Sequence, residues 1–84
     1  MFQSLRLQDS VALVTGGGSG IGRAAALAFV RDGAKVVVAG RRELELLETV
    51  DLIHAQGGEA LAVPTDVTDS AQVKALIAVT LAHF

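Results

Sequence analysis

Residues 15–22 read TGGGSGIG and place five glycines in eight positions. The apolar run Val11–Thr15 leads into them, and apolar residues at helical spacing begin at Ile21. A short β-branched run that ends in glycines is typical of a strand buried on both faces of a parallel sheet. Glycine tolerates positive φ and lacks Cβ, so it suits a tight turn from a strand into a helix. The stretch therefore predicts a strand, a glycine-rich bend and a helix.

The same alternation continues along the chain. Lys35–Gly40 and residues 60–63 are further predicted strands, and helical spacing extends to Gly33, over residues 43–56, and again from Ser70. Each helix should turn an apolar stripe toward the sheet. The stripes are Ile21, Ala25, Ala28 and Phe29; Leu44, Leu47, Val50 and Ile53 or His54; and Val73, Leu76, Ile77 and Leu81.

Alternating strands and helices form right-handed βαβ units with a parallel sheet. The predicted fold class is α/β, a Rossmann-type, three-layer, doubly wound parallel sheet, present as a βαβαβα half with strand order 3-2-1. The first strand of such a sheet is central, so one edge of residues 11–15 has no predicted partner. Because an unpaired strand edge can pair with another chain, we expect that the protein can self-associate through this exposed edge. Residues 1–84 are expected to be one partial domain, the amino-terminal half, without the carboxy-terminal catalytic half.

Composition narrows the class of protein. Of the 84 residues, 51% are hydrophobic and 19% charged, with a mean hydropathy of +0.51 and a net charge of -2, which disfavours a disordered chain or a nucleic-acid partner. No apolar run approaches the roughly 18 residues of a membrane span, so no membrane partner is expected. The start has no signal-peptide pattern and the chain has no cysteine. A cytoplasmic location is the expectation.

The bend is suited to an anion. The first N–H groups of a helix have no intrahelical acceptor, and the helix dipole adds partial positive charge there, so a pyrophosphate fits. The alternative is that the glycines form only a turn. A Walker P-loop is excluded because no Gly-Lys-Ser/Thr follows, and the lack of an acidic residue just before the glycines disfavours an S-adenosylmethionine site.

Three spaced motifs carry a family resemblance: TGxxxGIG in residues 15–22, VVVAGRR in residues 36–42 and TDVTD in residues 65–69. Together they resemble the amino-terminal portion of the short-chain dehydrogenase/reductase family, from about residue 10 to residue 84. The resemblance implies an NAD(H) or NADP(H) site on a Rossmann fold. It also implies that Asp66 and Val67 lie beside the adenine, with Asp66 accepting from the exocyclic amine. The residues implied at the phosphates and ribose are Gly16, Ser19, Gly20, Ile21 and Gly22.

The end of the second strand bears on the choice of cofactor. NAD sites usually hold an acid about 20 residues past the glycines, whereas NADP sites use an arginine near the 2′-phosphate. Gly40 stands at the acid position, and Arg41 and Arg42 follow. We therefore predict NADP in preference to NAD, with both arginines binding the cofactor. The alternative is that the arginines are only solvated, and that Arg42 pairs with a glutamate one turn along the helix.

Other polar residues have simpler interpretations. Asp69 is a predicted N-cap, and His54 and His83 have no second ligand at metal spacing, so no metal site is assigned. The resembling family uses a Tyr and a Lys four residues later, with a Ser and an Asn, in the later half of its domain. This chain has no Tyr and no Asn, so no catalytic residue is assigned, and a small-molecule substrate is expected only for a full-length form.

Two functions from different classes stay open. The first is the cofactor-binding half of an oxidoreductase that acts on an alcohol/carbonyl pair. The second is a non-catalytic module that binds nucleotide or pairs through a strand edge. A truncated remnant without function is the third alternative.

Overall fold

The computed structural model describes residues 4–7, 11–16, 18 and 20–84. Strands and helices alternate after an initial strand, as the sequence predicts from residue 11 onward. The elements in chain order are β1 (Ser4–Leu7), β2 (Val11–Thr15), α1 (Gly20–Arg31), β3 (Lys35–Gly40), α2 (Glu43–Ala55), β4 (Ala60–Pro64) and α3 (Ser70–His83).

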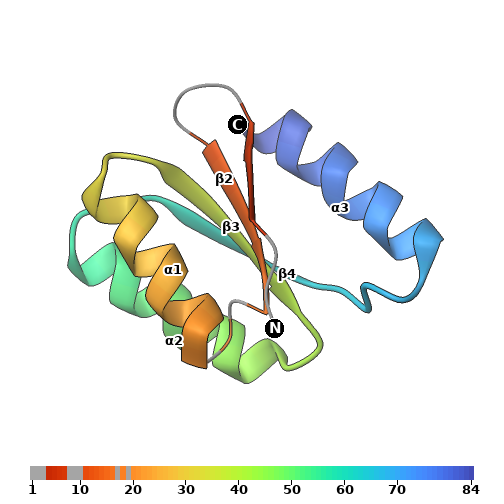
Figure 1. Cartoon of the computed structure of the whole chain (residues 1–84), viewed down its shortest axis with the longest axis horizontal. Helices are drawn as coiled ribbons and strands as arrows, with labels where there is room; N and C mark the ends of the chain where they lie inside the picture. The colour runs from red at the N-terminus through yellow and green to blue at the C-terminus, as the bar shows by residue number, and fades with distance from the viewer. Residues whose placement is uncertain (1–3, 8–10, 17, 19) are drawn as a thin grey trace.

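The three predicted strands form a parallel sheet. Within the described residues the strand order is β1-β2-β3-β4, with β2 parallel to β3 and β3 parallel to β4. Helices α1 and α2 cover one face of the sheet, and α3 covers the other (Figure 1). The predicted three-layer α/β half with its 3-2-1 order is confirmed.

The edge of β2 differs from the prediction. Strand β1 runs antiparallel to β2, with Ser4 opposite Val14 and Leu7 opposite Val11. The backbone groups of β2 that were expected to be unpaired therefore bond to a segment of the same chain. The prediction of an exposed edge at residues 11–15 is wrong, and self-association through that edge loses its structural basis.

Side chains of the central strands alternate between two cores. Ala12, Val14, Val36 and Val38 pack against α1 and α2 on one face. Leu13, Val37 and Ala39 pack with Leu76 of α3 on the other face. Because both faces are covered, β2 and β3 are apolar at nearly every position, as expected for strands of a parallel sheet.

The helix stripes agree only in part with the prediction. In α2 the buried residues are Leu46, Thr49, Val50 and Ile53, whereas Leu44 is 78% exposed. Leucines at positions 44, 46 and 47 leave the stripe ambiguous in sequence, and the packing of Leu46 into the core beneath the sheet decides it.

The stripes of α1 and α3 also agree only in part with the prediction, since the predicted Phe29 and Leu76 do pack in the two cores. In α1 the buried residues are Gly22 and Ala26, whose small size lets the helix lie close to the sheet, while Ile21 is 69% exposed. In α3 the buried residues are Leu76 and Thr80, and Leu81 is exposed. Across the described part of the chain, no helix has both the length and the apolar character needed to cross a membrane.

Candidate functional site

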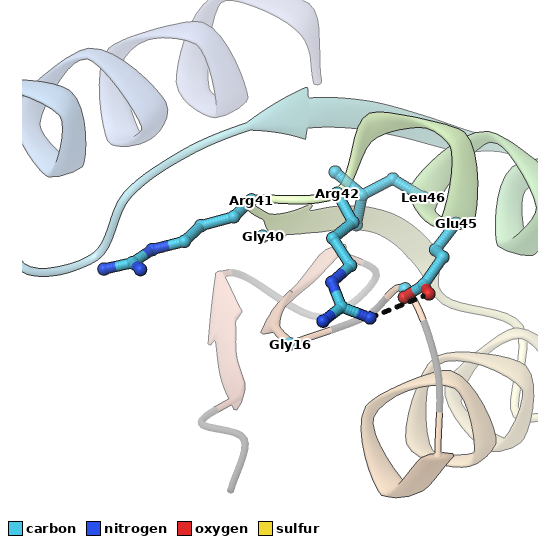
Figure 2. Close-up of a pocket in the computed structure, with 7 residues that line it drawn as sticks. Gly16, Gly40, Arg41, Arg42, Glu45 and Leu46 are labelled. Atoms are coloured by element: carbon cyan, nitrogen blue, oxygen red, sulfur yellow. Dashed lines mark hydrogen bonds and ion pairs between the residues drawn. The ribbon is translucent and has the colours of Figure 1, made fainter.

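A pocket lies where the carboxyl ends of β2 and β3 meet the start of α2. It is a cavity of about 380 Å³, and Figure 2 shows the residues around it. The bend after β2 forms one side, and the residues after β3 form the other. The lining residues are Gly16, Gly18, Gly40, Arg41, Arg42, Glu45 and Leu46.

The bend requires glycine at two described positions. Gly16 has φ 69° and Gly20 has φ 57°, both in the left-handed region that side chains rarely adopt. Both glycines are exposed, and a Cβ built on Gly20 would meet nothing within 4 Å. The bend therefore presents backbone with open space beside it at the start of α1.

Gly18 has a different role from its neighbours. A Cβ on this buried glycine would lie 3.0 Å from Cβ of Glu45 and 3.5 Å from the Glu45 carbonyl carbon. Its missing side chain thus makes room for α2. The glycine-rich bend is packed against that helix at the level of the backbone.

The two arginines after β3 point in different directions. Arg41 extends away from Gly16, and its Nη2 lies 3.0 Å from Oδ1 of Asp66 (Figure 2). Arg42 points across the pocket toward the bend, and its Nη1 lies 3.3 Å from Oε1 of Glu45. The pairing of Arg42 with a glutamate one turn along the helix, which the sequence left as an alternative, is thus present.

Asp66 accepts several hydrogen bonds at one oxygen. Its Oδ1 receives the Thr68 hydroxyl at 2.6 Å, the Thr68 backbone N–H at 2.9 Å and Arg41 at 3.0 Å. Donation from Thr68, and secondarily from Arg41, lowers the pKa of Asp66 from 3.8 to about 2. Asp66 is therefore ionised at neutral pH. Asp69 accepts from the backbone N–H groups of Ala71 and Gln72, so its predicted N-cap role is confirmed.

Not all the predicted cofactor residues line the pocket. Gly16, Arg41 and Arg42 do, and Arg41 connects Asp66 to them. The predicted residues Gly20, Ile21 and Gly22 form the first turn of α1 beside the bend, with Gly22 buried. Val67 is 52% exposed next to Asp66, and Ser19 lies outside the described residues.

Two polar residues near the pocket, Arg23 and Thr49, were missed by the sequence analysis. Arg23 of α1 donates from Nε to Oγ1 of Thr49 at 2.8 Å and from Nη2 to the Glu45 carbonyl at 3.0 Å. Two signals existed for these contacts. Thr49 places a hydroxyl within a buried stripe, where it needs a partner. Arg23 places a cation near a helix N-terminus, where the dipole disfavours it.

The charges around the bend suit a phosphate group more than a metal ion. The first turn of α1 has no acidic residue, and the Arg42 guanidinium lies over the pocket. Glu45 is the opposing charge on the pocket wall. The described residues contain no group of three His, Cys, Asp or Glu side chains that could hold a metal ion. Exposed positive-φ glycines at a helix N-terminus fit the phosphates of a dinucleotide.

Comparisons with known proteins agree with this geometry. A family model described as short chain dehydrogenase matches residues 10–84. The chain is similar to the A-factor type gamma-butyrolactone 1'-reductase (1S-forming) of Streptomyces virginiae, with 45% identity over 78 residues, 93% of this chain and 30% of that protein.

Two solved structures are similar as well. One is a short chain dehydrogenase/reductase from Burkholderia phymatum in complex with NAD, with TM-score 0.83 and 46% identity over 86% of this chain and 26% of that one. The other is a variant of the actinorhodin polyketide ketoreductase with NADPH, with TM-score 0.86 and 34% identity over 90% of this chain and 29% of that one. The chain spans no more than 30% of the length of these three proteins. Because the family model covers nearly the whole sequence, the chain belongs to the short-chain dehydrogenase/reductase family.

Proposed function

We propose that the chain binds a nicotinamide dinucleotide, with NADP(H) preferred to NAD(H). The observation that carries this proposal is the bend, whose exposed positive-φ glycines open α1 beside a pocket that Arg42 overhangs. Similar structures contain NAD in one case and NADPH in another, which supports the cofactor class but leaves the choice open.

Each part of the cofactor has a proposed set of partners. The pyrophosphate lies at the bend, against Gly16, Ser19 and Gly20, with Ile21 and Gly22 in the first turn of α1. The adenine lies beside Val67, and its amine donates to Asp66, whose Oδ1 is already engaged by Thr68 and Arg41. Oδ2 of Asp66 is therefore the acceptor that we assign to the amine.

The 2′-phosphate of NADP is assigned to Arg41 and Arg42. Arg42 already points over the pocket, so it reaches the phosphate by leaving Glu45. Arg41 pairs with Asp66 and points away from the pocket, so its side chain must change direction further before it can bind the 2′-phosphate. Both pairs are solvent-exposed, and such pairs contribute only about 0–1 kcal/mol, so a dianionic phosphate competes well for either guanidinium.

The wider role is that of a cofactor-binding half, residues 1–84, in a cytoplasmic oxidoreductase that acts on an alcohol/carbonyl pair. The bound cofactor would supply hydride transfer. The residues of this chain hold and orient it, and no catalytic role is assigned to any of them. A non-catalytic nucleotide-binding module would use the same pocket.

Titration of the chain with NADPH and with NADH, followed by nicotinamide fluorescence, tests the proposal. We expect tighter binding of NADPH. Arg42→Gln should weaken NADPH about tenfold and NADH little, because a charge-assisted hydrogen bond is lost. Arg41→Gln should have a smaller effect of the same kind. Arg31→Gln, at the last turn of α1, is the matched control.

Two outcomes contradict the proposal. Failure of the unaltered chain to bind either dinucleotide removes the function altogether. Equal weakening of NADPH and NADH by Arg42→Gln would leave dinucleotide binding in place and remove the role of Arg42 at the 2′-phosphate.

A further inference from the structure

A buried threonine connects the glycine-rich bend to two helices. Thr49 of α2 is fully buried, and its Oγ1 accepts the Arg23 Nε proton at 2.8 Å. The same oxygen lies 3.4 Å from the Gly18 carbonyl oxygen and 3.2 Å from the Glu45 carbonyl oxygen. The bend, α1 and α2 therefore meet at one hydroxyl group.

The hydroxyl has one proton, and the Gly18 and Glu45 carbonyls both lie within hydrogen-bond distance of it. The Glu45 carbonyl already receives a proton from Nη2 of Arg23 at 3.0 Å. The Gly18 carbonyl is buried and therefore needs a donor. Arg23 thus donates to the Glu45 carbonyl with Nη2 and to the hydroxyl oxygen with Nε, while the hydroxyl donates to the Gly18 carbonyl.

We propose that Arg23 and Thr49 are positioning residues that keep the Gly18 carbonyl turned toward α2 and away from a bound pyrophosphate. The inference rests on the proposed dinucleotide function and deepens it. A carbonyl oxygen that faced the phosphates would repel them. At 3.4 Å the Thr49–Gly18 hydrogen bond is long, and we expect it to shorten when the cofactor binds.

The experiment compares two buried threonines in helices. Thr80 of α3 is also buried, and its Oγ1 donates to the Leu76 carbonyl at 2.8 Å on the other face of the sheet. Thr49→Val and Thr80→Val each remove one hydroxyl without changing side-chain size. We expect Thr49→Val to weaken NADPH and NADH equally, about tenfold, and Thr80→Val to leave both affinities unchanged.

A second ligand separates positioning of the bend from general loss of structure. Adenosine 2′-monophosphate has the ribose phosphate and the adenine but no pyrophosphate. Thr49→Val should leave its affinity unchanged, and Thr49→Ser, which keeps the hydroxyl, should restore dinucleotide binding. In the absence of nucleotide, the carbonyl carbon resonance of Gly18 should move in Thr49→Val and stay fixed in Thr80→Val.

The outcomes distinguish this inference from the function on which it rests. If the unaltered chain binds dinucleotide and Thr49→Val binds it as well as Thr80→Val does, the positioning role is overturned and the function stands. If the unaltered chain binds neither dinucleotide, both are overturned. Should Thr49→Val fail to fold by circular dichroism, Arg23→Met decides, because it leaves the Thr49 side chain intact. Unchanged dinucleotide affinity in Arg23→Met would contradict the proposal.

Discussion

The two sides of the pocket are held by different kinds of contact. On the bend side, Gly18 and Thr49 are buried, and the bonds run to backbone carbonyls. On the other side, Arg41 pairs with Asp66 and Arg42 with Glu45, with the arginine side chains 67% and 80% exposed. One side is built from the interior of the fold, and the other from its surface.

The difference indicates how each side responds to a ligand. Leaving a buried acceptor without its partner costs about 1–3 kcal/mol, whereas an exposed ion pair contributes about 0–1 kcal/mol. The contact of Gly18 with α2 should therefore persist when a ligand binds, whereas the two arginines should change partners at little cost. Recognition of the pyrophosphate should depend on backbone geometry, and discrimination at the ribose on mobile charges. Substitutions at the bend should accordingly have the larger effects.

The largest effect is expected from Gly20→Val. A β-branched residue at φ +57° costs at least about 1–2 kcal/mol of folding stability, and its side chain enters the open space assigned to the pyrophosphate. Binding of both dinucleotides should be abolished, as measured by fluorescence titration. Gly33→Val is the control, because Gly33 has φ +90° and open space but lies at the far end of α1. Equal loss of binding in both variants would mean that backbone strain alone lowers the affinity. The proposed role of the bend in binding the pyrophosphate would then be contradicted.

The fold was largely predictable because its signals are local and repeated. Short continuous apolar runs, helical spacing and glycine stops located every element from Val11 to the end of α3. Strand β1 was missed because residues 4–7 are too few to give a period, and their pairing depends on the edge of β2. The rotation of α2 also depends on tertiary contacts, since Leu46 is selected over Leu44 by what lies opposite.

The backbone of the candidate site could be predicted from the sequence, but the directions of its side chains could not. Motif spacing singled out Gly16 and the two arginines, which line the candidate pocket, and Gly20, which begins α1. The direction of each arginine could not be read, because it depends on which carboxylate lies within reach after folding. The contact of Arg23 with Thr49 joins residues 26 positions apart, and no local pattern encodes it.

A smaller effect, below the tenfold changes expected for Arg42→Gln and Thr49→Val, should come from Glu45→Gln, which tests the arginine side of the pocket. This carboxylate lines the cavity and pairs with Arg42, so it would repel the proposed 2′-phosphate and compete for the guanidinium group. We expect NADPH to bind severalfold more tightly, with NADH nearly unchanged and the difference reduced at high salt. Glu48→Gln, on the same helix but outside this pocket, is the matched control. A gain for both dinucleotides would indicate that Glu45 acts on the bend and not on the ribose end.

The smallest effect should appear at Asp66, as a dependence of stability on pH. Its pKa is about 2 in the folded protein and near 3.8 when the chain is unfolded. Ionised Asp66 therefore stabilises the fold above about pH 4, and this contribution is lost as the pH falls from about 4 to about 2. Asp66→Asn should remove that part of the acid dependence in thermal unfolding.

The Asp66 carboxyl also allows the effects of Thr68 and Arg41 on its pKa to be compared. The Thr68 hydroxyl is the largest cause of the lowered pKa, ahead of Arg41, so Thr68→Val should raise the Asp66 pKa further than Arg41→Gln does. Nuclear magnetic resonance titration of the Asp66 carboxyl carbon measures both shifts. High salt should diminish the Arg41 contribution and spare that of Thr68, because exposed charges are screened and a short hydroxyl bond is not. The reverse order would mean that the ion pair with Arg41, and not the turn within residues 66–68, is the main cause of the lowered Asp66 pKa.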